Sequence, residues 1–228
     1  EVLFGQEGLV ENLKPGTVVI SCATVAPTFA KDMEKRCKKF KVLYLDAPIS
    51  GGALKAKNGQ LSIMASGVKE AFQHARPTLD SISETVFELG DEAGTGSAMK
   101  SVNQLLAGVH IAVMAEALTF GISQGISPDK FVEVISKCAG TSWMLENRAP
   151  HIVNGDYKPH SSINIWPKDL GIVLDVALES KFNAPIATAA LEQFRTAVDM
   201  GLGFEDDAAV AKVYAKSANL SLPKKNDV

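Results

Sequence analysis

The spacing of apolar residues changes once along this chain, and that change limits the folds it can adopt. Up to residue 93, short apolar runs of strand length alternate with segments of helical periodicity. This alternation is typical of a mostly parallel sheet covered by helices. From Gly96 onward, apolar residues recur at helical spacing over long segments. The sequence therefore predicts an α/β part followed by an all-helical part.

The pattern also predicts the limits of the elements. In the first part we expect strands at 17–21, 42–46, 60–65 and 85–89, with helices at 28–39 and 70–81. In the second part we expect helices at 99–124, 128–139, 143–153, 168–181, 185–200 and 208–218. The glycine-rich stretch 90–96 joins the two parts. We therefore expect a domain at 1–93, a helical domain at 94–220 and an exposed tail at 221–228.

Charge and composition exclude several classes of partner. The chain has 23 Lys and Arg residues against 26 Asp and Glu residues, a net charge of −3. We therefore expect no nucleic acid and no membrane as a partner. The basic run 35–39 is expected to be the exposed face of a helix. The three cysteines and four histidines have no metal-ligand spacing, so we expect no metal.

The sequence also indicates where in the cell the protein is located. No apolar stretch approaches the roughly 18 residues of a membrane span, and the first residues do not have the pattern of a secretory signal. Nor do the cysteines predict a disulfide framework. We expect a soluble, cytoplasmic protein.

Lys100 is the first candidate functional residue, because it follows a glycine-rich turn at the start of a long apolar helix. The positive end of the helix dipole, together with burial, would lower its pKa toward the range that a general base needs. Asn103 and Gln104, three and four residues further on, share its helix face. On this evidence alone, a solvated surface lysine is the more common interpretation of such a position.

A second candidate is the stretch 46–52, Asp-Ala-Pro-Ile-Ser-Gly-Gly, which directly follows an expected strand. Successive small residues expose backbone N–H groups that can hold a carboxylate or phosphate. The alternative is a plain strand-ending loop.

Two further residues stand where a cofactor can bind. Thr24 follows the first expected strand, and open α/β sheets bind ligands beyond the carboxyl ends of their strands. It could equally cap the helix that begins at Pro27. Lys168 stands at a helix start, where a cation is disfavoured unless an external anion balances it. The alternative is a solvated lysine.

Four motifs in order give the chain a resemblance to a known family. They are Asp-Ala-Pro-x-Ser-Gly-Gly at 46–52, Gly-x-Leu-x-x-Met-x-x-Gly at 59–67, Gly-x-Gly-x-x-x-Lys-x-x-Asn at 94–103, and Lys-Asp-Leu at 168–170. Together they resemble the β-hydroxyacid dehydrogenase family, which includes 3-hydroxyisobutyrate, tartronate semialdehyde and 6-phosphogluconate dehydrogenases. Within it, the stretches 103–112 and 142–148 most resemble the L-threonate dehydrogenase branch.

The resemblance implies a fold, a reaction and a set of roles. The first domain would be the later part of a Rossmann-like nucleotide-binding domain, and the reaction would be NAD-dependent oxidation of a short hydroxy acid, with NADP not excluded. Lys100 would be the catalytic acid and base. The substrate carboxylate would be held by Ser50, Gly51 and Gly52, and its hydroxyls would be oriented by Asn103 and Gln104. The cofactor would contact Thr24 and Lys168.

The chain departs from the family pattern in two ways. Gln104 stands where the family commonly has a second Asn, and the longer amide is expected to change the substrate accepted. The family's opening strand and Gly-x-Gly-x-x-Gly turn do not occur here, so we expect a truncated fragment that lacks the pyrophosphate site and is inactive alone.

The substrate is expected to be of the L-threonate or 3-hydroxyisobutyrate type, because few basic residues near the motifs could hold a phosphate. The alternative function is a non-catalytic dimerisation or binding module derived from the same family. In either case the long apolar helix predicts a homodimer or higher oligomer.

Overall fold

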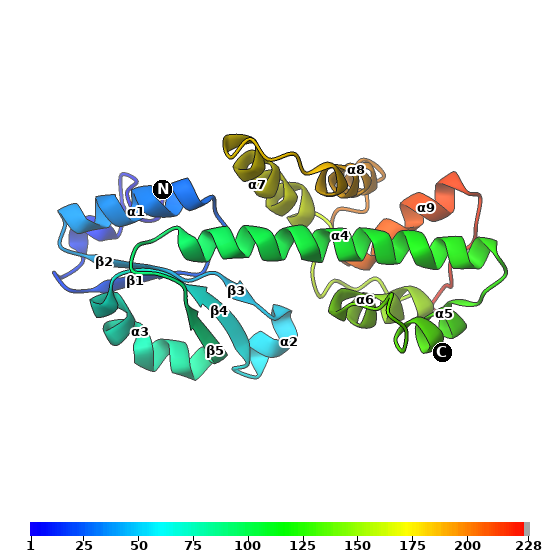
Figure 1. Cartoon of the computed structure of the whole chain (residues 1–228), viewed down its shortest axis with the longest axis horizontal. Coiled ribbons are helices and arrows are strands. Elements are labelled where there is room, and N and C mark those ends of the chain that lie inside the picture. The colour runs from blue at the N-terminus through cyan, green and yellow to red at the C-terminus, as the bar shows by residue number, and fades with distance from the viewer. Residues whose placement is uncertain (226–228) are drawn as a thin grey trace. The chain divides into compact units, whose positions relative to one another are not determined.

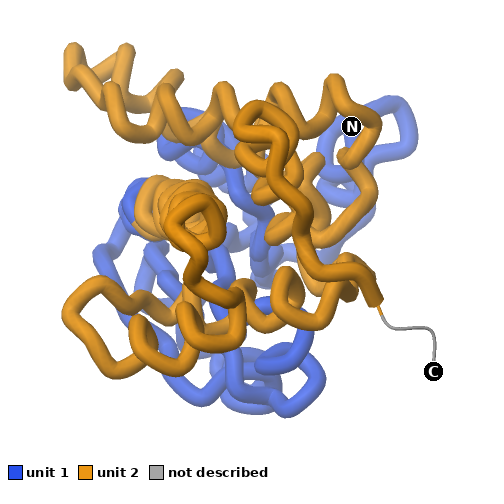
Figure 2. Tube along the Cα trace, turned by 90° about the vertical axis from the view of Figure 1, so that its right-hand side faces the viewer, with its two compact units in different colours: residues 1–102 blue, residues 103–228 orange. Residues whose placement is uncertain are grey.

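The computed structural model describes residues 1–225, which divide into two compact units (Figure 2). The division falls between Val102 and Asn103, inside the helix α4, Thr95–Ser123. The boundary predicted from the sequence lies earlier, at 93/94. Of the predicted tail 221–228, residues 226–228 lie outside the described residues.

The first unit is an α/β layer structure (Figure 1). Strand β1, Val18–Ser21, pairs in parallel with β2, Leu43–Asp46. Strand β4, Leu61–Ala65, pairs in parallel with β5, Ser83–Glu88, and antiparallel with the short β3, Ile49–Ser50. A bridge between Asp46 and Ser66 links the two sets of strands.

Helices cover both faces of these strands. Helix α1, Pro27–Lys39, and helix α3, Lys69–Ile82, lie on opposite sides in Figure 1. Residues of β2 alternate between them: Tyr44 packs with the buried side of α1, whereas Leu45 packs with that of α3. This follows from the two-residue period of a strand, and burial on both faces is typical of parallel sheets.

The second unit is entirely helical and surrounds one hydrophobic core. Besides the later part of α4, its helices are α5, Pro128–Ile135; α6, Trp143–Val153; α7, Ile165–Glu179; α8, Pro185–Asp199; and α9, Ala211–Ser217. A short 3-10 helix, Asp207–Val210, precedes α9. Trp166 of α7 stacks on Phe194 of α8, with ring centroids 5.4 Å apart, and both side chains are buried.

The predicted fold class, α/β followed by all-α, is confirmed, and most predicted elements are present within a few residues. The helix predicted at 143–153 has the same limits as α6. The short 3-10 helix Val10–Asn12 was not predicted. Among the strands and α-helices two were missed, namely β3 and the helix α2, Gly52–Lys57. Neither carries a readable signal, because β3 has two residues and α2 buries none. The stretch 46–52 is therefore a strand end, β3 and the start of α2 rather than a simple loop.

No membrane-spanning stretch is expected from the sequence, and α4 corrects that expectation. Thr95–Ser123 is long and apolar enough to cross a membrane by length and composition, with a mean hydropathy of 1.8 over the best window. Of that window, 44% is buried inside the protein. Core helices of water-soluble proteins meet the same criterion, so this is weak evidence for a membrane.

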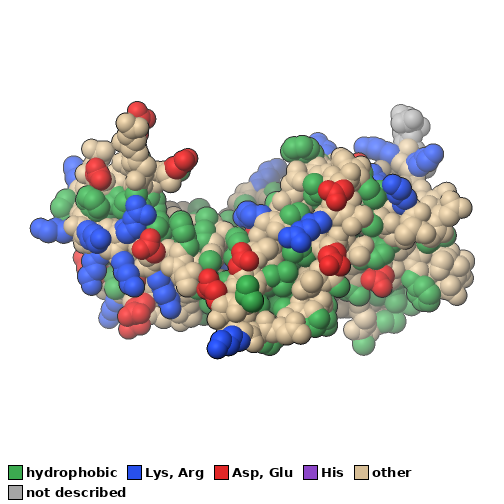
Figure 3. Space-filling model, turned by 90° about the horizontal axis from the view of Figure 1, so that it is seen from above, with side chains coloured by type: hydrophobic (Ala, Val, Ile, Leu, Met, Phe, Trp, Pro, Cys, Tyr) green, Lys and Arg blue, Asp and Glu red, His purple; other side chains and the backbone are tan. Residues whose placement is uncertain are grey.

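The basic run lies on α1, where Lys and Arg side chains gather on the surface of the first unit (Figure 3). Lys35, Lys38 and Lys39 are exposed. The guanidinium of Arg36 lies 3.9 Å above the centre of the Phe4 ring. Lys38 and Lys39 stand in the last turn of α1, where cations favour the helix dipole. The prediction of a solvated helix face is consistent with this placement.

Candidate functional site

The start of α4 is held by the carboxylate of Asp46, at the end of β2. Its Oδ2 accepts hydrogen bonds from the backbone N–H groups of Gly94, at 2.9 Å, and Ser97, at 2.8 Å. Its Oδ1 accepts from the Ser97 hydroxyl at 2.7 Å. Through these hydrogen bonds Asp46, which is completely buried, acts as an N-cap of α4 supplied by a distant part of the chain. A side chain at Gly96 would collide with the carbonyl oxygen of Met64, so the helix start also needs glycine there.

Lys100 lies one turn beyond Ser97, and its residue is only 8% exposed. Its Nζ donates a hydrogen bond to the carbonyl oxygen of Ile49, in β3, at 2.8 Å. The interpretation of Lys100 as a solvated surface lysine is therefore wrong. Instead, the lysine lies against the stretch that contains the predicted carboxylate site.

The predicted carboxylate site begins at the residue after Ile49. Ser50 pairs with Ser62 of β4, and the chain then turns through Gly51 and Gly52 into α2. Gly51 has φ of 130° and Gly52 has φ of 67°, values that favour glycine. Gly52 is exposed, and Ser50 and Gly51 are half-buried. The backbone here is thus open to a ligand beside Lys100.

Thr24 lies in the connection from β1 to α1, beyond the carboxyl end of β1. The N-cap position of α1 is Ala26, and α1 has no side-chain cap. Thr24 is therefore not the helix cap, the alternative left open by the sequence. Burial raises the pKa of the thiol of the nearby Cys22, which disfavours its thiolate form.

In the second unit, the remaining predicted residues are connected through Asp169. Asn103 Nδ2 donates to Gln104 Oε1 at 3.0 Å, and Gln104 Nε2 donates to Asp169 Oδ2 at 2.6 Å. Lys168 Nζ lies 2.9 Å from Asp169 Oδ1. This last contact is an ion pair without hydrogen-bond geometry, since Oδ1 has no hydrogen-bond partner among residues 1–225. Asp169 is 3% exposed, whereas the Lys168 side chain is 59% exposed.

Close packing of α4 on α7 supports this arrangement. A Cβ atom at Gly108, one turn beyond Gln104, would lie 3.0 Å from side-chain atoms of Leu170 and Trp166. Glycine at this position therefore lets α7 approach α4 closely, next to the contact between Gln104 and Asp169.

Asp46 and Asp169 are organising residues that were not predicted from the sequence. Both stand inside motifs identified in the sequence, but their partners are 48 to 65 residues away in the chain. The signal that could have found them was the place of each carboxylate, Asp46 at the end of a buried strand and Asp169 directly after Lys168.

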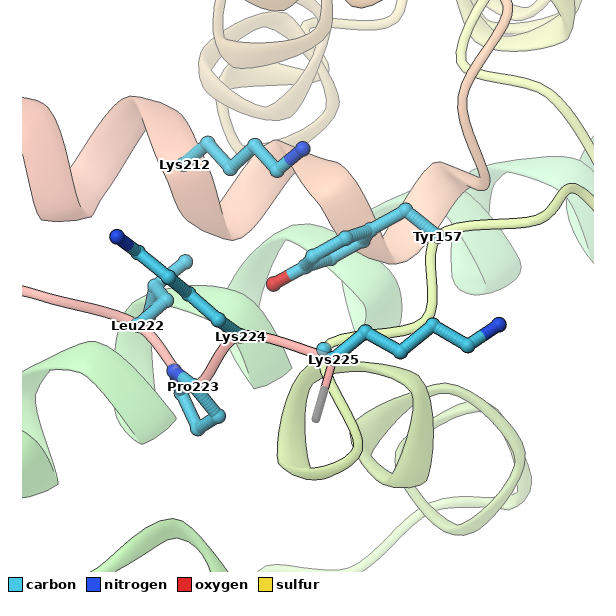
Figure 4. Close-up of a pocket in the computed structure, with 7 residues that line it drawn as sticks. Tyr157, Lys212, Leu222, Pro223, Lys224 and Lys225 are labelled. Carbon is cyan, nitrogen blue, oxygen red and sulfur yellow. The ribbon is translucent and has the colours of Figure 1, made fainter. Parts of the chain in front are cut away.

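Other parts of the second unit do not bring predicted site residues together. A hollow of about 300 Å³ is lined by Gly155, Tyr157, Lys212 and the chain from Leu222 to Lys225 (Figure 4). Lys212 Nζ lies 4.1 Å from the centre of the Tyr157 ring, and burial raises the pKa of this tyrosine to about 12. The predicted tail thus lies against the protein as far as Lys225. Within the described residues, no group of three or more His, Cys, Asp or Glu is arranged to hold a metal ion.

Both parts of the chain match known families of domains. Residues 1–90 match the family described as the NAD binding domain of 6-phosphogluconate dehydrogenase. Residues 94–214 match the family described as NAD-binding of NADP-dependent 3-hydroxyisobutyrate dehydrogenase.

Individual relatives agree with these matches. The chain is 48% identical to an L-threonate dehydrogenase of Cupriavidus necator over 213 residues, which cover 93% of this chain and 72% of the relative. It is 45% identical to the L-threonate dehydrogenase of Escherichia coli K12, with coverage of 94% and 71%. Among solved structures, 3-hydroxyisobutyrate dehydrogenase from Salmonella typhimurium superposes with a TM-score of 0.87 at 42% identity, covering 91% of this chain and 73% of that one.

Proposed function

Because the chain belongs to the β-hydroxyacid dehydrogenase family of NAD(P)-dependent oxidoreductases, we propose that Lys100 is the acid and base in its reaction with a short hydroxy acid. In the oxidative direction, Lys100 accepts the proton of the substrate hydroxyl while the carbon that bears this hydroxyl loses a hydride. The nicotinamide of NAD or NADP supplies the chemistry that takes up the hydride. In the reverse direction, Lys100 returns the proton to the carbonyl oxygen.

The observation that carries this proposal is the burial of Lys100 beside the stretch 49–52. Its hydrogen bond to Ile49 fixes the position of Nζ. A neutral amine has two N–H bonds and a lone pair. It can therefore keep its bond to Ile49 while the lone pair accepts the substrate proton.

The substrate carboxylate is held by Ser50, Gly51 and Gly52, and Asn103 contacts the hydroxyl groups. Two features support this part of the proposal. The backbone turns sharply at both glycines beside Lys100, and Asn103 follows Lys100 on α4 by three residues. A hydroxyl-rich acid of the L-threonate type or 3-hydroxyisobutyrate is the proposed substrate, in line with the names of the relatives.

Thr24 and Lys168 are the proposed cofactor contacts. Thr24 fits a dinucleotide because it is half-buried beyond the carboxyl end of a parallel strand, and the following helix has no side-chain cap on its first N–H groups. Lys168 fits because its exposed side chain can reach an anionic group.

Steady-state kinetics of purified Lys100→Ala, measured with the whole protein, tests the role of the lysine. We expect kcat to fall by about 10²- to 10⁴-fold, the usual contribution of general acid–base catalysis. Lys69→Ala is the matched control, because Lys69 is exposed at the start of α3. Full activity of the Lys100 variant would refute the assignment.

A substrate panel tests the function itself. The full-length protein is offered L-threonate, 3-hydroxyisobutyrate, glycerate and 6-phosphogluconate, each with NAD and with NADP. We expect turnover with L-threonate or 3-hydroxyisobutyrate. Absence of turnover with every pair would favour the alternative of a non-catalytic module.

We further propose that the helical part forms a homodimer or higher oligomer. Leu106, Val113 and Phe120 recur every seven residues on α4 and are 49%, 53% and 65% exposed. This spacing is that of a helix–helix seam. Light scattering should give a dimer or larger species and a smaller one for Val113→Glu, with exposed Lys216→Glu as control. A monomeric wild-type protein would contradict the proposal.

A further inference from the structure

Gln104 is engaged at both ends of its side-chain amide. The nitrogen donates to Asp169, and the oxygen accepts from Asn103. Gln104 is 7% exposed and Asp169 is 3% exposed, so water does not compete freely for these groups. A line of two hydrogen bonds thus runs from a buried carboxylate, through a buried amide, to the half-buried Asn103.

The direction of this line is set by Asp169. An ionised carboxylate only accepts hydrogen bonds, so the Gln104 amide must present its nitrogen to Asp169. Its oxygen is then turned toward Asn103, which must present its own nitrogen in return. The remaining capacity of Asn103 is therefore fixed as an acceptor oxygen and one further N–H. An acceptor oxygen suits a hydroxyl that donates its proton.

We propose that Asp169 is a positioning residue that fixes, through Gln104, the hydrogen-bond polarity that Asn103 offers to the substrate. This inference rests on the proposed function, in which Asn103 contacts the substrate hydroxyl groups. Gln104 is then a link inside the protein rather than a direct substrate contact. The close packing of α4 on α7 at Gly108 keeps the link short.

The two contacts of Gln104 explain why a side chain longer than that of Asn stands at this position. Its nitrogen spans to a carboxylate on α7 while its oxygen still reaches the adjacent residue on α4. The ion pair with Lys168 uses the other oxygen of Asp169, so it does not compete with Gln104.

Side-chain amide NMR tests the link without any need for turnover. In the wild-type protein, the bonded N–H groups of Gln104 and Asn103 should exchange slowly with water. In Asp169→Asn the facing amide can either donate or accept, and both exchange rates should rise by about tenfold or more. Asp175→Asn, an exposed position on the same helix, is the control and should change neither rate. Unchanged rates in Asp169→Asn would overturn the proposal.

An exchange of the two groups supplies the sharper kinetic test. Asp169→Asn and Gln104→Glu should each lower kcat/KM for the hydroxy acid by about tenfold or more at saturating cofactor, the first because the link loses its fixed polarity and the second because two facing carboxylates repel each other and break the link. In the double variant, donor and acceptor are reversed at the contact between positions 104 and 169. The new amide nitrogen at position 169 donates to the new carboxylate at position 104, whose other oxygen still accepts from Asn103. The double variant should therefore recover to within about threefold of wild type.

The outcomes separate the two claims. Recovery of kcat/KM in the double variant, with thermal stability unchanged in both single variants, supports the positioning role, because a purely structural role predicts that kcat/KM falls only together with stability. A double variant as impaired as the worse single variant, with normal thermal stability, would overturn it. If the wild-type protein turns over no hydroxy acid, the proposed function fails, and the NMR result alone then decides whether Asp169 fixes the orientation of Asn103.

Discussion

Replacing Asp46 with Ala should strongly destabilise the first unit, because this carboxylate accepts the hydrogen bonds at the start of α4. The change leaves the backbone N–H groups of Gly94 and Ser97 buried without their acceptor. Each buried unsatisfied group costs about 1 to 3 kcal/mol, so the two predict a loss of about 2 to 6 kcal/mol. The favourable placement of a negative charge at a helix N-terminus is lost as well.

Asp46→Asn should be milder. The oxygen that remains can still accept from both N–H groups. The new nitrogen replaces an oxygen that accepted from the Ser97 hydroxyl, and it can donate to that hydroxyl. Only the contribution of the negative charge to these hydrogen bonds is lost, and we expect the free energy of unfolding to fall by about 1 to 2 kcal/mol. Asp80→Ala is the control, because Asp80 makes only an exposed ion pair with Arg76, which is worth about 0 to 1 kcal/mol.

Urea denaturation measures the overall loss for each variant, and native-state hydrogen exchange locates it. The Ser97 amide should lose protection in Asp46→Ala by about tenfold for each 1.4 kcal/mol. A loss below about 1 kcal/mol, with the Ser97 amide still protected, would refute the capping role.

Further predictions concern the second unit. Gly108→Ala should destabilise by about 1 to 3 kcal/mol through contact with Leu170, whereas Gly171→Ala in α7, with open space around it, should stabilise by up to about 1 kcal/mol in thermal unfolding. Arg148→Ala should cost about 3 to 5 kcal/mol in urea denaturation, because it leaves the completely buried Asp207 without the guanidinium that lies 2.6 Å away. Burial raises the pKa of Asp207 above 3.8, so the folded protein binds this proton more readily than the unfolded chain. The free energy of unfolding, compared with that of Asp207→Asn, should therefore fall as pH rises from about 3.8 through the raised pKa. A constant difference between the two proteins across that range would contradict the prediction.

The parts of the fold that were predictable depend on local pattern. Helix α6 has the limits that its helical apolar pattern predicted, and the structure shows that Ser142 caps it by accepting from the Leu145 N–H. The missed α2 has no buried residue to mark it. The limits of α9 were blurred because the chain enters it through a 3-10 turn at Asp207–Val210.

The candidate site shows the same division between local and long-range information. Spacing alone put Lys100 and Asn103 on one helix, and helical geometry made that reliable. Spacing did not show that Lys100 is buried, because its partner Ile49 is 51 residues away in the chain. Contacts of this kind form when separate elements pack, and the sequence pattern of either element does not contain them.

Gln104 shows how such a contact changes the meaning of a residue. Beside Asn103 in the sequence, it has the properties of a second amide for substrate hydroxyls, and its extra methylene suggests an altered specificity. Once its nitrogen is bound to Asp169, the same extra length is used inside the protein. A change at Gln104 would then affect the substrate only through the orientation of Asn103. Substrates that differ at the hydroxyl contacted by Asn103 should therefore respond to Asp169→Asn and to Gln104→Glu in the same order.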